Sequence, residues 1–298
     1  MIQSFAKFFG YSGLTFVFLW VLPKSTTFRM DQCNDYFKSY SIFEKIFIKL
    51  VRFNPVKLKV LKTLFIKTDS GLISILLNIN EFTQLCFYFK KFDKQLLLEI
   101  QKGGYCFIDV GANIGFYSLV ASRYFEKILA FEPSNENYCR LLEAVNCSEI
   151  NNIQIFNCGL SSETKMAYLY LNNENSGGHS VEKKLGGWQA KALAESVYLK
   201  RLDEMAISFE AEMGLEFRSR ILVKIDVEGH ESEVLVGAKE FITNQRPDLF
   251  MEVSFDVANV HRLLKLLPLG YEIVNLEGSN DPAVVGENVL LSVVRQAM

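Results

Sequence analysis

The sequence predicts an α/β fold with a mostly parallel seven-stranded sheet, a closing antiparallel strand and helices ahead of it in the chain. From about residue 103, short apolar runs alternate with amphipathic segments of helical length, as in strands connected by helices. The last two apolar runs have no helical spacer, which predicts a hairpin and therefore one antiparallel strand. The first third of the chain differs in composition. We therefore expect a hydrophobic and basic helical segment at 1–80 and the α/β domain at 81–298.

The expected strands occupy the apolar runs 105–110, 127–131, 153–156, 221–225, 249–253, 271–276 and 289–294. Helical periodicity fills most of the intervals between them, at 116–125, 134–147, 231–243 and 257–267. Connections of this kind place helices on both faces of a parallel sheet. Residues 172–196 are polar and rich in glycine, so we expect an inserted loop above the carboxyl edge of the sheet.

The N-terminal segment combines an apolar stretch with a basic one. Residues 8–23 carry no charge, but they are shorter than the ~20 residues that a membrane-spanning helix needs. Residues 38–68 contain eight Lys or Arg residues against one acid, Glu44, and apolar residues recur there at helical spacing. A buried helical cap and a membrane-surface contact through residues 1–67 both stay open. We expect a cytoplasmic protein, held at a membrane surface if this segment is an anchor.

Composition excludes several classes of protein. A chain with 49% hydrophobic and 22% charged residues is neither disordered nor fibrous. Its 32 basic and 34 acidic residues nearly cancel, so we expect no nucleic-acid partner. The six cysteines form no C-x-x-C pair, which excludes a zinc ribbon and a thioredoxin-like motif.

The first strand of the domain leads into a glycine turn, in the sequence FIDVGANIGFYSL. Gly111 and Gly115 let the main chain approach a ligand closely, at the edge of the sheet where α/β folds bind ligands. Asn113 stands at the middle glycine position of the dinucleotide fingerprint, and no phosphate-binding Lys-Ser/Thr follows. The turn is therefore predicted to bind a ligand without a pyrophosphate, and nicotinamide chemistry is disfavoured. Asp109, at the strand end, is expected to hold an amino group of the ligand or to orient the turn.

The next strand ends at Glu132, 21 residues after Gly111, where such folds place an acid against ribose hydroxyls. A nucleoside without a diphosphate, joined to a cationic amino-acid tail, describes S-adenosylmethionine. Asn157 and Gly159 follow the third strand, where we expect the adenine to lie against main chain and small residues.

The chain also resembles a known family. The blocks FIDVGANIGFYSL, FEPSNENY, NCGLSSE, LKRLDE, LVKIDVEGHESEVLVGA and PDLFMEV follow one another as in the FkbM-type methyltransferases, over about residues 82–298. This resemblance implies a Rossmann-like methyltransferase fold that uses S-adenosylmethionine. It carries over the family's cofactor loop and ribose acid to Asp109, Gly111, Asn113, Gly115 and Glu132. It carries over the family's D-x-E-G-x-E block to Asp226, Glu228, Gly229 and Glu231. His230 stands where the family typically has a small residue, so no role for it follows from the resemblance.

The acidic block after the fourth strand holds the expected catalytic residues, Asp226, Glu228 and His230. Methyl transfer to a hydroxyl releases a proton, which a carboxylate or an imidazole can accept. We expect Glu228 or His230 to act as the base and Asp226 to position the cofactor or the acceptor. Alternatively, Asp226, Glu228 and Glu252 hold a divalent ion that lowers the pKa of the acceptor hydroxyl, but no metal is expected. Glu231 either belongs to this site or begins the next helix.

The sequence thus predicts an S-adenosylmethionine-dependent methyltransferase that acts on a hydroxyl of a sugar, a glycan or another small molecule. The alternative is a catalytically inactive, membrane-associated binding or scaffold protein that keeps the fold, which the N-terminal segment and His230 motivate. The oligomeric state is not indicated by any pattern in the sequence.

Overall fold

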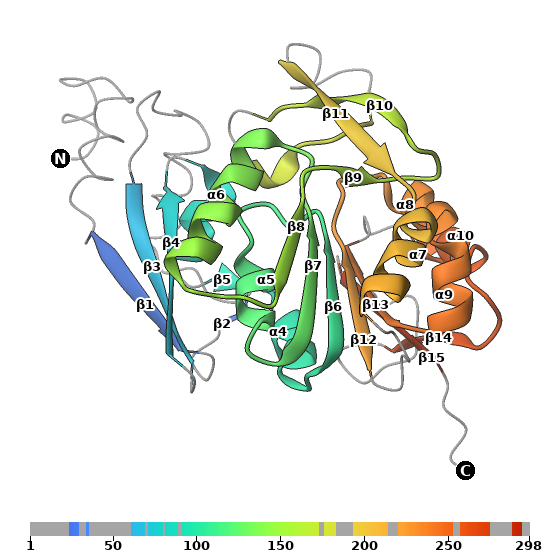
Figure 1. The fold of residues 1–298 in the computed structure, drawn as a ribbon, viewed down its shortest axis with the longest axis horizontal. Helices are drawn as coiled ribbons and strands as arrows, with labels where there is room; N and C mark the ends of the chain where they lie inside the picture. The colour runs from blue at the N-terminus through green and yellow to red at the C-terminus, as the bar shows by residue number, and fades with distance from the viewer. Residues whose placement is uncertain are drawn as a thin grey trace.

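The computed structural model describes residues 24–29, 34–35, 61–68, 71–79, 81–88, 91–172, 176–182, 193–213, 220–252, 257–274 and 288–293. A seven-stranded sheet with the order β14-β15-β13-β12-β6-β7-β8 lies at its centre (Figure 1). The strands are β6 (Gly104–Val110), β7 (Phe125–Phe131), β8 (Ile153–Phe156), β12 (Ile221–Ile225), β13 (Asp248–Glu252), β14 (Tyr271–Val274) and β15 (Asn288–Val293). β15 is antiparallel to β13 and β14, whereas β13, β12, β6, β7 and β8 pair in parallel. The predicted α/β class and the mostly parallel seven-stranded sheet are confirmed, including the closing antiparallel strand.

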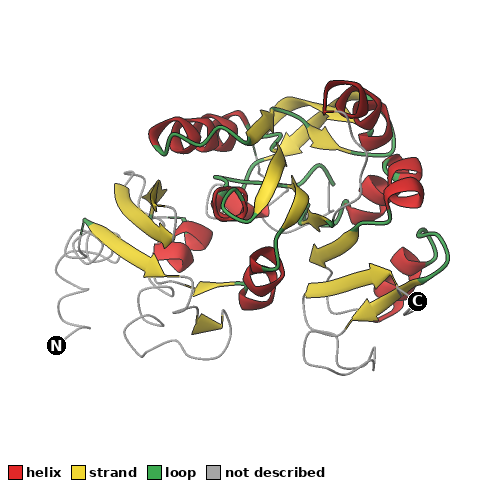
Figure 2. Cartoon of the chain, turned by 60° about the horizontal axis from the view of Figure 1, so that its bottom comes forward, coloured by secondary structure: helices red, strands yellow, loops and turns green. Residues whose placement is uncertain are grey.

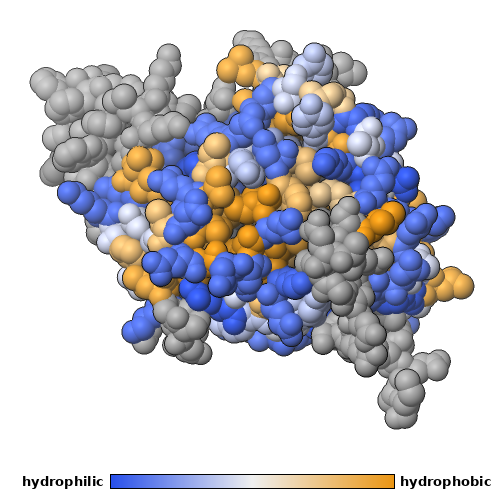
Figure 3. Space-filling view, viewed as in Figure 1, coloured by the Kyte–Doolittle hydropathy of each residue, from blue (hydrophilic) through white to orange (hydrophobic). Residues whose placement is uncertain are grey.

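Helices cover both faces of this sheet (Figures 1 and 2). One face packs against α4 (Lys94–Gln101), α5 (Phe116–Ala121) and α6 (Asn135–Cys147). The other face packs against α7 (Leu202–Met213), α8 (Glu231–Gly237), α9 (Lys239–Gln245) and α10 (Val257–Leu264). Successive side chains of a strand point to opposite faces, so Phe107 joins the first core while Cys106 and Ile108 join the second. Between α6 and α7, hydrophobic residues gather near the centre of the view in Figure 3, with hydrophilic residues around them.

The predicted helix at 231–243 is two helices. The chain leaves helical conformation at Ala238, which has φ −112° and ψ 13°. Just before this break, Gly237 approaches Ser161 so closely that a Cβ on the glycine would lie 1.9 Å from the serine carbonyl oxygen. Because Ser161 lies far away in the sequence, the helical periodicity alone gave no sign of this contact.

A smaller sheet stands above the carboxyl edge of the large one (Figure 1). In it, β11 (Ala194–Lys200) pairs antiparallel with β10 (Lys165–Tyr170) and parallel with β9 (Gly159–Leu160). The loop expected at 172–196 therefore ends inside a strand. Its described part is the segment 176–182, which begins with the short 3₁₀ helix η2 (Ser176–Gly178).

The described part of residues 1–80 forms strands, so the prediction of helices is wrong there. β1 (Ser25–Arg29), β3 (Leu61–Thr68) and β4 (Gly71–Asn78) make a sheet in the order β1-β3-β4, and the short strand β2 (Asn34–Asp35) pairs with β5 (Lys91–Phe92). The physical reason is a period of two, because Leu64, Ile66, Ile73, Ile75 and Leu77 are buried while their neighbours are more exposed.

The predictions for residues 8–23 and for most of 38–68 fall outside the described residues, so the membrane-surface contact stays a prediction. Within the described ranges, no helix combines the length and the apolar composition that crossing a membrane requires.

The described N-terminal strands share the core of the α/β domain. Side chains of β3 and β4 belong to the same buried cluster as Phe107 of β6 and Phe116 of α5. Helix α3 (Phe82–Tyr88) connects the two parts, and its Phe87 stacks on Phe116 with ring centroids 5.0 Å apart. The expected boundary at residue 80 therefore lies within one continuous apolar core.

Candidate active site

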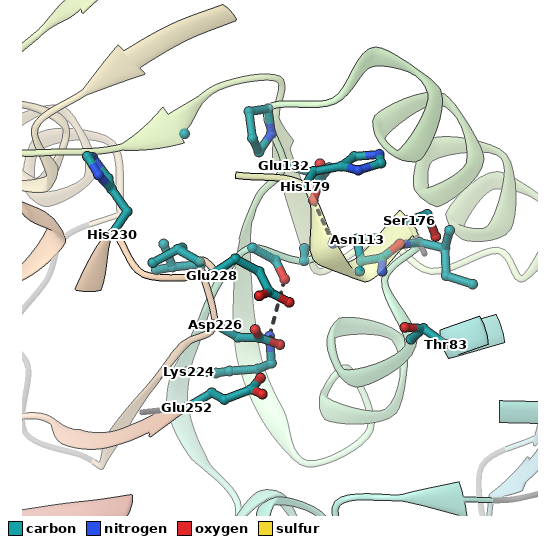
Figure 4. Close-up of a pocket in the computed structure, with 18 of the residues that line it drawn as sticks. Thr83, Asn113, Glu132, Ser176, His179, Lys224, Asp226, Glu228, His230 and Glu252 are labelled. Atoms are coloured by element: carbon teal, nitrogen blue, oxygen red, sulfur yellow. Dashed lines mark hydrogen bonds and ion pairs between the residues drawn. The ribbon is translucent and has the colours of Figure 1, made fainter. Parts of the chain in front are cut away.

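A cavity of about 480 Å³ opens at the carboxyl edge of the large sheet. This volume is in the range of small-molecule sites. Its walls come from the turn after β6, the ends of β7, β12 and β13, the smaller sheet, the segment 176–182 and α3 (Figure 4). The charged or hydrogen-bonding side chains among its described lining include Thr83, Asp93, Asn113, Glu132, Ser176, His179, Lys224, Asp226, Glu228, His230 and Glu252.

The turn after β6 presents main chain to this cavity. Gly111 and Gly115 have φ values of 81° and 82°, in the left-handed region that favours glycine. A Cβ on Gly111 would lie 1.9 Å from the carbonyl oxygen of Asp226, and one on Gly115 would lie 2.0 Å from Leu141 Cδ1. Asn113 also has a positive φ of 52°, and its Oδ1 accepts a 2.7 Å hydrogen bond from the next main-chain N–H. The turn therefore depends on glycine at both positions.

Asp109 lies beneath the turn and is completely buried. Its Oδ2 accepts a 2.7 Å hydrogen bond from Ser118 Oγ, and its Oδ1 lies 3.3 Å from Nζ of Lys224. Asp109 is not part of the cavity lining. Of the two roles expected for it, this placement matches orientation of the turn.

Glu132 lines the cavity and points toward the turn (Figure 4). Its Oε2 accepts a 2.7 Å hydrogen bond from the main-chain N–H of Asn113, and its Oε1 accepts one of 2.9 Å from Ser134. Burial raises the pKa of Glu132 to about 7, although these hydrogen bonds act in the opposite direction. Each carboxylate oxygen has a further lone pair that can accept from a ligand hydroxyl.

Asn157 and Gly159 have different positions. The side chain of Asn157 donates to the carbonyl oxygens of Glu132 and Pro133, at 3.1 and 3.2 Å, and is outside the cavity lining. Gly159 lines the cavity, and a Cβ there would lie 2.8 Å from Leu199 Cδ2. The contact of this region with an adenine stays a prediction, carried by Gly159 and the main chain.

A buried lysine on β12 contacts both the glycine turn and the acidic block of the predicted site. Lys224 Nζ lies 3.2 Å from Asp226 Oδ2 and 3.3 Å from Asp109 Oδ1, and it donates a 3.2 Å hydrogen bond to the carbonyl oxygen of Gly111. Burial lowers the pKa of Lys224, but the two carboxylates outweigh burial and raise it, so the ammonium form is stable. Sequence reasoning missed this residue. The available signal was a lysine within an otherwise apolar strand, ILVKI.

Asp226 and Glu252 form a carboxyl pair at the cavity, beside Lys224 (Figure 4). The neighbouring Asp226 charge is the main cause that raises the pKa of Glu252 above its ordinary value, and the two carboxyl groups are joined by a side-chain hydrogen bond. Among the described residues, no group of three or more His, Cys, Asp or Glu side chains is arranged to hold a metal ion.

Glu228 and His230 follow on the same loop. Glu228 has a φ of 54° and is exposed at the cavity, whereas His230 is buried. The His230 Nδ1 lies 2.6 Å from Glu182 Oε1, and its Nε2 lies 3.0 Å from Ser161 Oγ. Both ring nitrogens therefore have hydrogen-bonding partners in this arrangement, and a role of His230 as base stays a prediction.

Glu231 is the first residue of α8, and its Oε1 accepts a 2.9 Å hydrogen bond from the N–H of Gly229. It lies outside the cavity lining. The position agrees with the alternative that Glu231 begins the helix.

The segment 176–182 brings His179 to the cavity. His179 Nδ1 accepts a 3.0 Å hydrogen bond from the N–H of Asn172, and burial lowers the pKa of the imidazole to about 4. At neutral pH the ring is therefore uncharged with its proton on Nε2, which makes it a hydrogen-bond donor.

Helix α3 adds Thr83 and Phe87 to the wall opposite the acidic block. Sequence reasoning missed both residues, because α3 reaches the cavity only through its packing and carries no motif.

The comparisons with known proteins show the family of this chain. Residues 109–273, more than half of the chain, match the profile of the Methyltransferase FkbM domain. The chain belongs to the FkbM methyltransferase family.

Its relatives include methyltransferases of different organisms. The FkbM-family chain is 32% identical to "Methyltransferase sdnD" of Sordaria araneosa over 162 residues, which cover 45% of this chain and 60% of that protein. It is 28% identical to "Hexuronic acid methyltransferase AglP" of Haloferax volcanii over 193 residues, which cover 63% of this chain and 72% of that protein. A crystal structure of a methyltransferase FkbM from Methylobacillus flagellatus is 18% identical, with a TM-score of 0.40 over 63% of this chain and 43% of that one.

Proposed function

We propose that the chain is an S-adenosylmethionine-dependent methyltransferase that methylates a hydroxyl group of a sugar, a glycan or another small molecule. The observation that carries this proposal is that one cavity brings together the glycine turn, the buried acid Glu132 and the acidic block from Asp226 to Glu228.

The residues of the cavity fit this cofactor. Main chain of the glycine turn lines the cavity, and Glu132 has lone pairs for the vicinal hydroxyls of a ribose. Gly159 lines the wall where the adenine is expected. The carboxylates of Asp226 and Glu228 favour a ligand that carries a sulfonium and an ammonium charge. When bound, the cofactor supplies an electrophilic methyl group.

The chain's own residues would align the acceptor and take its proton. Alignment of this kind contributes about 7–11 kcal/mol to lowering the barrier. Asp226 is the favoured base, because Lys224 and Glu252 hold its carboxylate in place, and Glu228 is the second carboxylate at the cavity. The uncharged His179 would donate a hydrogen bond from Nε2 to an acceptor oxygen.

A sugar acceptor is supported by one relative. AglP, at 28% identity, is named for methylation of a hexuronic acid. The cavity is also bordered by hydrogen-bonding side chains from several elements, among them Thr83, Asp93 and Ser176, as polyhydroxylated ligands require.

The test uses the purified full chain. Calorimetry measures the binding of S-adenosylmethionine, and methyl-labelled cofactor incubated with a fractionated lysate labels the acceptor, which mass spectrometry then identifies. The proposal fails if the folded chain neither binds the cofactor nor transfers label. Full activity in strong chelator would remove the divalent-ion alternative.

Asp226→Asn tests the base. We expect this variant to bind the cofactor more weakly, because it loses a charge that favours a cationic ligand. At saturating cofactor it should transfer methyl groups about 10²–10⁴-fold more slowly, because the amide cannot accept the proton. The matched control is Asp248→Asn on the neighbouring strand, where the carboxylate pairs with Arg220 at 2.7 Å away from the cavity. An Asp226→Asn rate equal to that of the control would assign the proton to Glu228.

A further inference from the structure

We propose that Lys224 is a positioning residue that fixes Asp226 against the glycine turn. Its ammonium group would thereby fix the distance and orientation between the bound cofactor, which donates the methyl group, and the carboxylate of Asp226, which accepts the proton. The inference rests on the proposed function and assigns a role to a residue that no motif singled out.

The sheet places Lys224 between the two halves of the site. In the parallel pairing of β12 and β6, Lys224 is the register partner of Asp109, so both side chains leave the sheet on the same face. Asp226 follows two residues later, in the loop directly after the same strand. The side chain of Lys224 therefore extends along the carboxyl edge beneath the cavity, which it also lines (Figure 4).

The ammonium group has partners on both sides. On the cofactor side it donates to the carbonyl oxygen of Gly111 at 3.2 Å and pairs with Asp109 at 3.3 Å. On the acceptor side it pairs with Asp226 at 3.2 Å. The ring of Tyr117, from the helix after the turn, lies 5.7 Å from Nζ and adds a cation–π contact. A movement of the turn is thereby transmitted to Asp226.

Stability alone does not account for this lysine. Every other residue of β12 is apolar and buried, and Lys224 itself is only 4% exposed. Removing an ammonium group and its carboxylate partners from water is costly, and apolar replacements of buried ion pairs are often as stable or more stable. The free-energy cost of burying the Lys224 ammonium group is explained if this group is needed to hold Asp226 and the glycine turn in place.

The same strand offers a matched control at its other end. Arg220, just before β12, bridges Glu99 at 2.9 Å and Asp248 at 2.7 Å. It is also a mostly buried cation between two carboxylates, but it lies outside the cavity lining. Arg220→Met therefore reports what the loss of a bridging cation does to folding alone.

The decisive variant is the double substitution Asp109→Asn with Lys224→Met. Lys224→Met alone leaves the buried Asp109 carboxylate without its cation, and this variant is expected to lower the melting temperature and cofactor binding together. The double variant removes both charges, and the amide oxygen introduced by Asp109→Asn can still accept the hydrogen bond from Ser118. Folding and the Kd for S-adenosylmethionine should therefore return to within about fivefold of the native values.

In the double variant, methyl transfer should stay slow even though folding and cofactor binding are restored. The probe is the lysate fraction in which the native chain labels an acceptor. With this probe, we expect the double variant to transfer label at least about 100-fold more slowly than the native chain. The acid limb of its pH–rate profile should move to higher pH, because losing a nearby cation raises the pKa of a carboxyl group. Arg220→Met, despite a lower melting temperature, should keep the native profile and a rate per folded molecule within about threefold.

Two outcomes would overturn the inference. A double variant with the native rate and pH profile would show that Lys224 only neutralises Asp109. A native chain that neither binds S-adenosylmethionine nor transfers label would remove the proposed function itself, and the inference with it.

Discussion

At the scale of single residues, the carboxyl group of Glu132 is the clearest case of a side chain whose protonation the fold controls. Burial raises its pKa from an ordinary 4.5 to about 7. The folded state therefore binds a proton more tightly than the unfolded state, and the stability contributed by this group is fully present below pH 4.5. It is lost as the pH rises through 7. The shift corresponds to roughly 3 kcal/mol.

Glu132→Gln should remove this pH dependence. We expect the free energy of unfolding of the native chain to fall more steeply between pH 5 and pH 8 than that of the variant, which does not titrate there. Urea unfolding at both pH values measures the difference. Glu126→Gln, an exposed position on the same strand, is the control and should follow the native slope. Parallel slopes for native and Glu132→Gln would contradict the raised pKa.

The residues that the sequence predicted are those whose role depends on local chain geometry. The glycine turn, Glu132 at the end of the second strand and the acidic block were recognisable because their spacing reflects strand ends and turns. Lys224 was not recognisable in this way, since the acids that surround it come from another strand or from the loop beyond its own. His230 is a different case. Its imidazole suggested a base, and the structure places the ring at the cavity with both nitrogens in contact with Glu182 and Ser161, so its catalytic role stays a prediction.

At the scale of elements, the segment 176–182 is held by hydrogen bonds to several elements around the cavity. At one end Ser176 Oγ accepts from Gln84 of α3 at 3.0 Å. Further along, Ser180 Oγ donates to the carbonyl oxygen of Glu228 at 3.0 Å, and Glu182 contacts His230. The segment thus joins α3 to the loop of the acidic block.

Glu182→Ala should loosen this segment. A hydrogen bond that involves a charged group contributes about 1.5–3 kcal/mol, so amide exchange at Ser180 should accelerate by at least about tenfold. Hydrogen exchange followed by mass spectrometry measures it on a peptide covering 176–182. Glu163→Ala, which removes an exposed acid paired with Lys165, is the control and should leave the exchange unchanged. Unchanged exchange in Glu182→Ala would mean that the contact between Glu182 and His230 does not stabilise the segment 176–182.

Strands with mostly apolar sequences were predicted well. The central parallel strands of the large sheet, such as β6 and β12, coincide with mostly apolar runs, because parallel strands buried on both faces need apolar residues along most of their length. The described N-terminal strands were predicted as part of a helical segment, because the prediction rested on the many lysines of this region and not on the alternation of apolar and polar residues. In β3 and β4 that alternation separates buried from more exposed positions.

At the scale of the whole molecule, the described N-terminal strands and the α/β domain form one apolar core. Leu77 of β4 and Phe107 of β6 belong to the same buried cluster. A mutation in β4 that opens a cavity should therefore destabilise the methyltransferase domain itself, although the sequence suggested a boundary at residue 80.

Leu76 and Leu77 allow a matched test of this coupling, because they are neighbours on one strand with opposite exposure. Leu77 is 0% exposed and Leu76 is 40% exposed. We expect Leu77→Ala to lower the free energy of unfolding by about 2–5 kcal/mol, whereas Leu76→Ala should cost less than about 1 kcal/mol. Urea unfolding monitored by circular dichroism gives the totals, and hydrogen exchange in β6 reports on the domain. If Leu77→Ala leaves exchange in β6 at the native rate, then β3 and β4 unfold independently of the α/β domain, and the core is divided as the sequence first suggested.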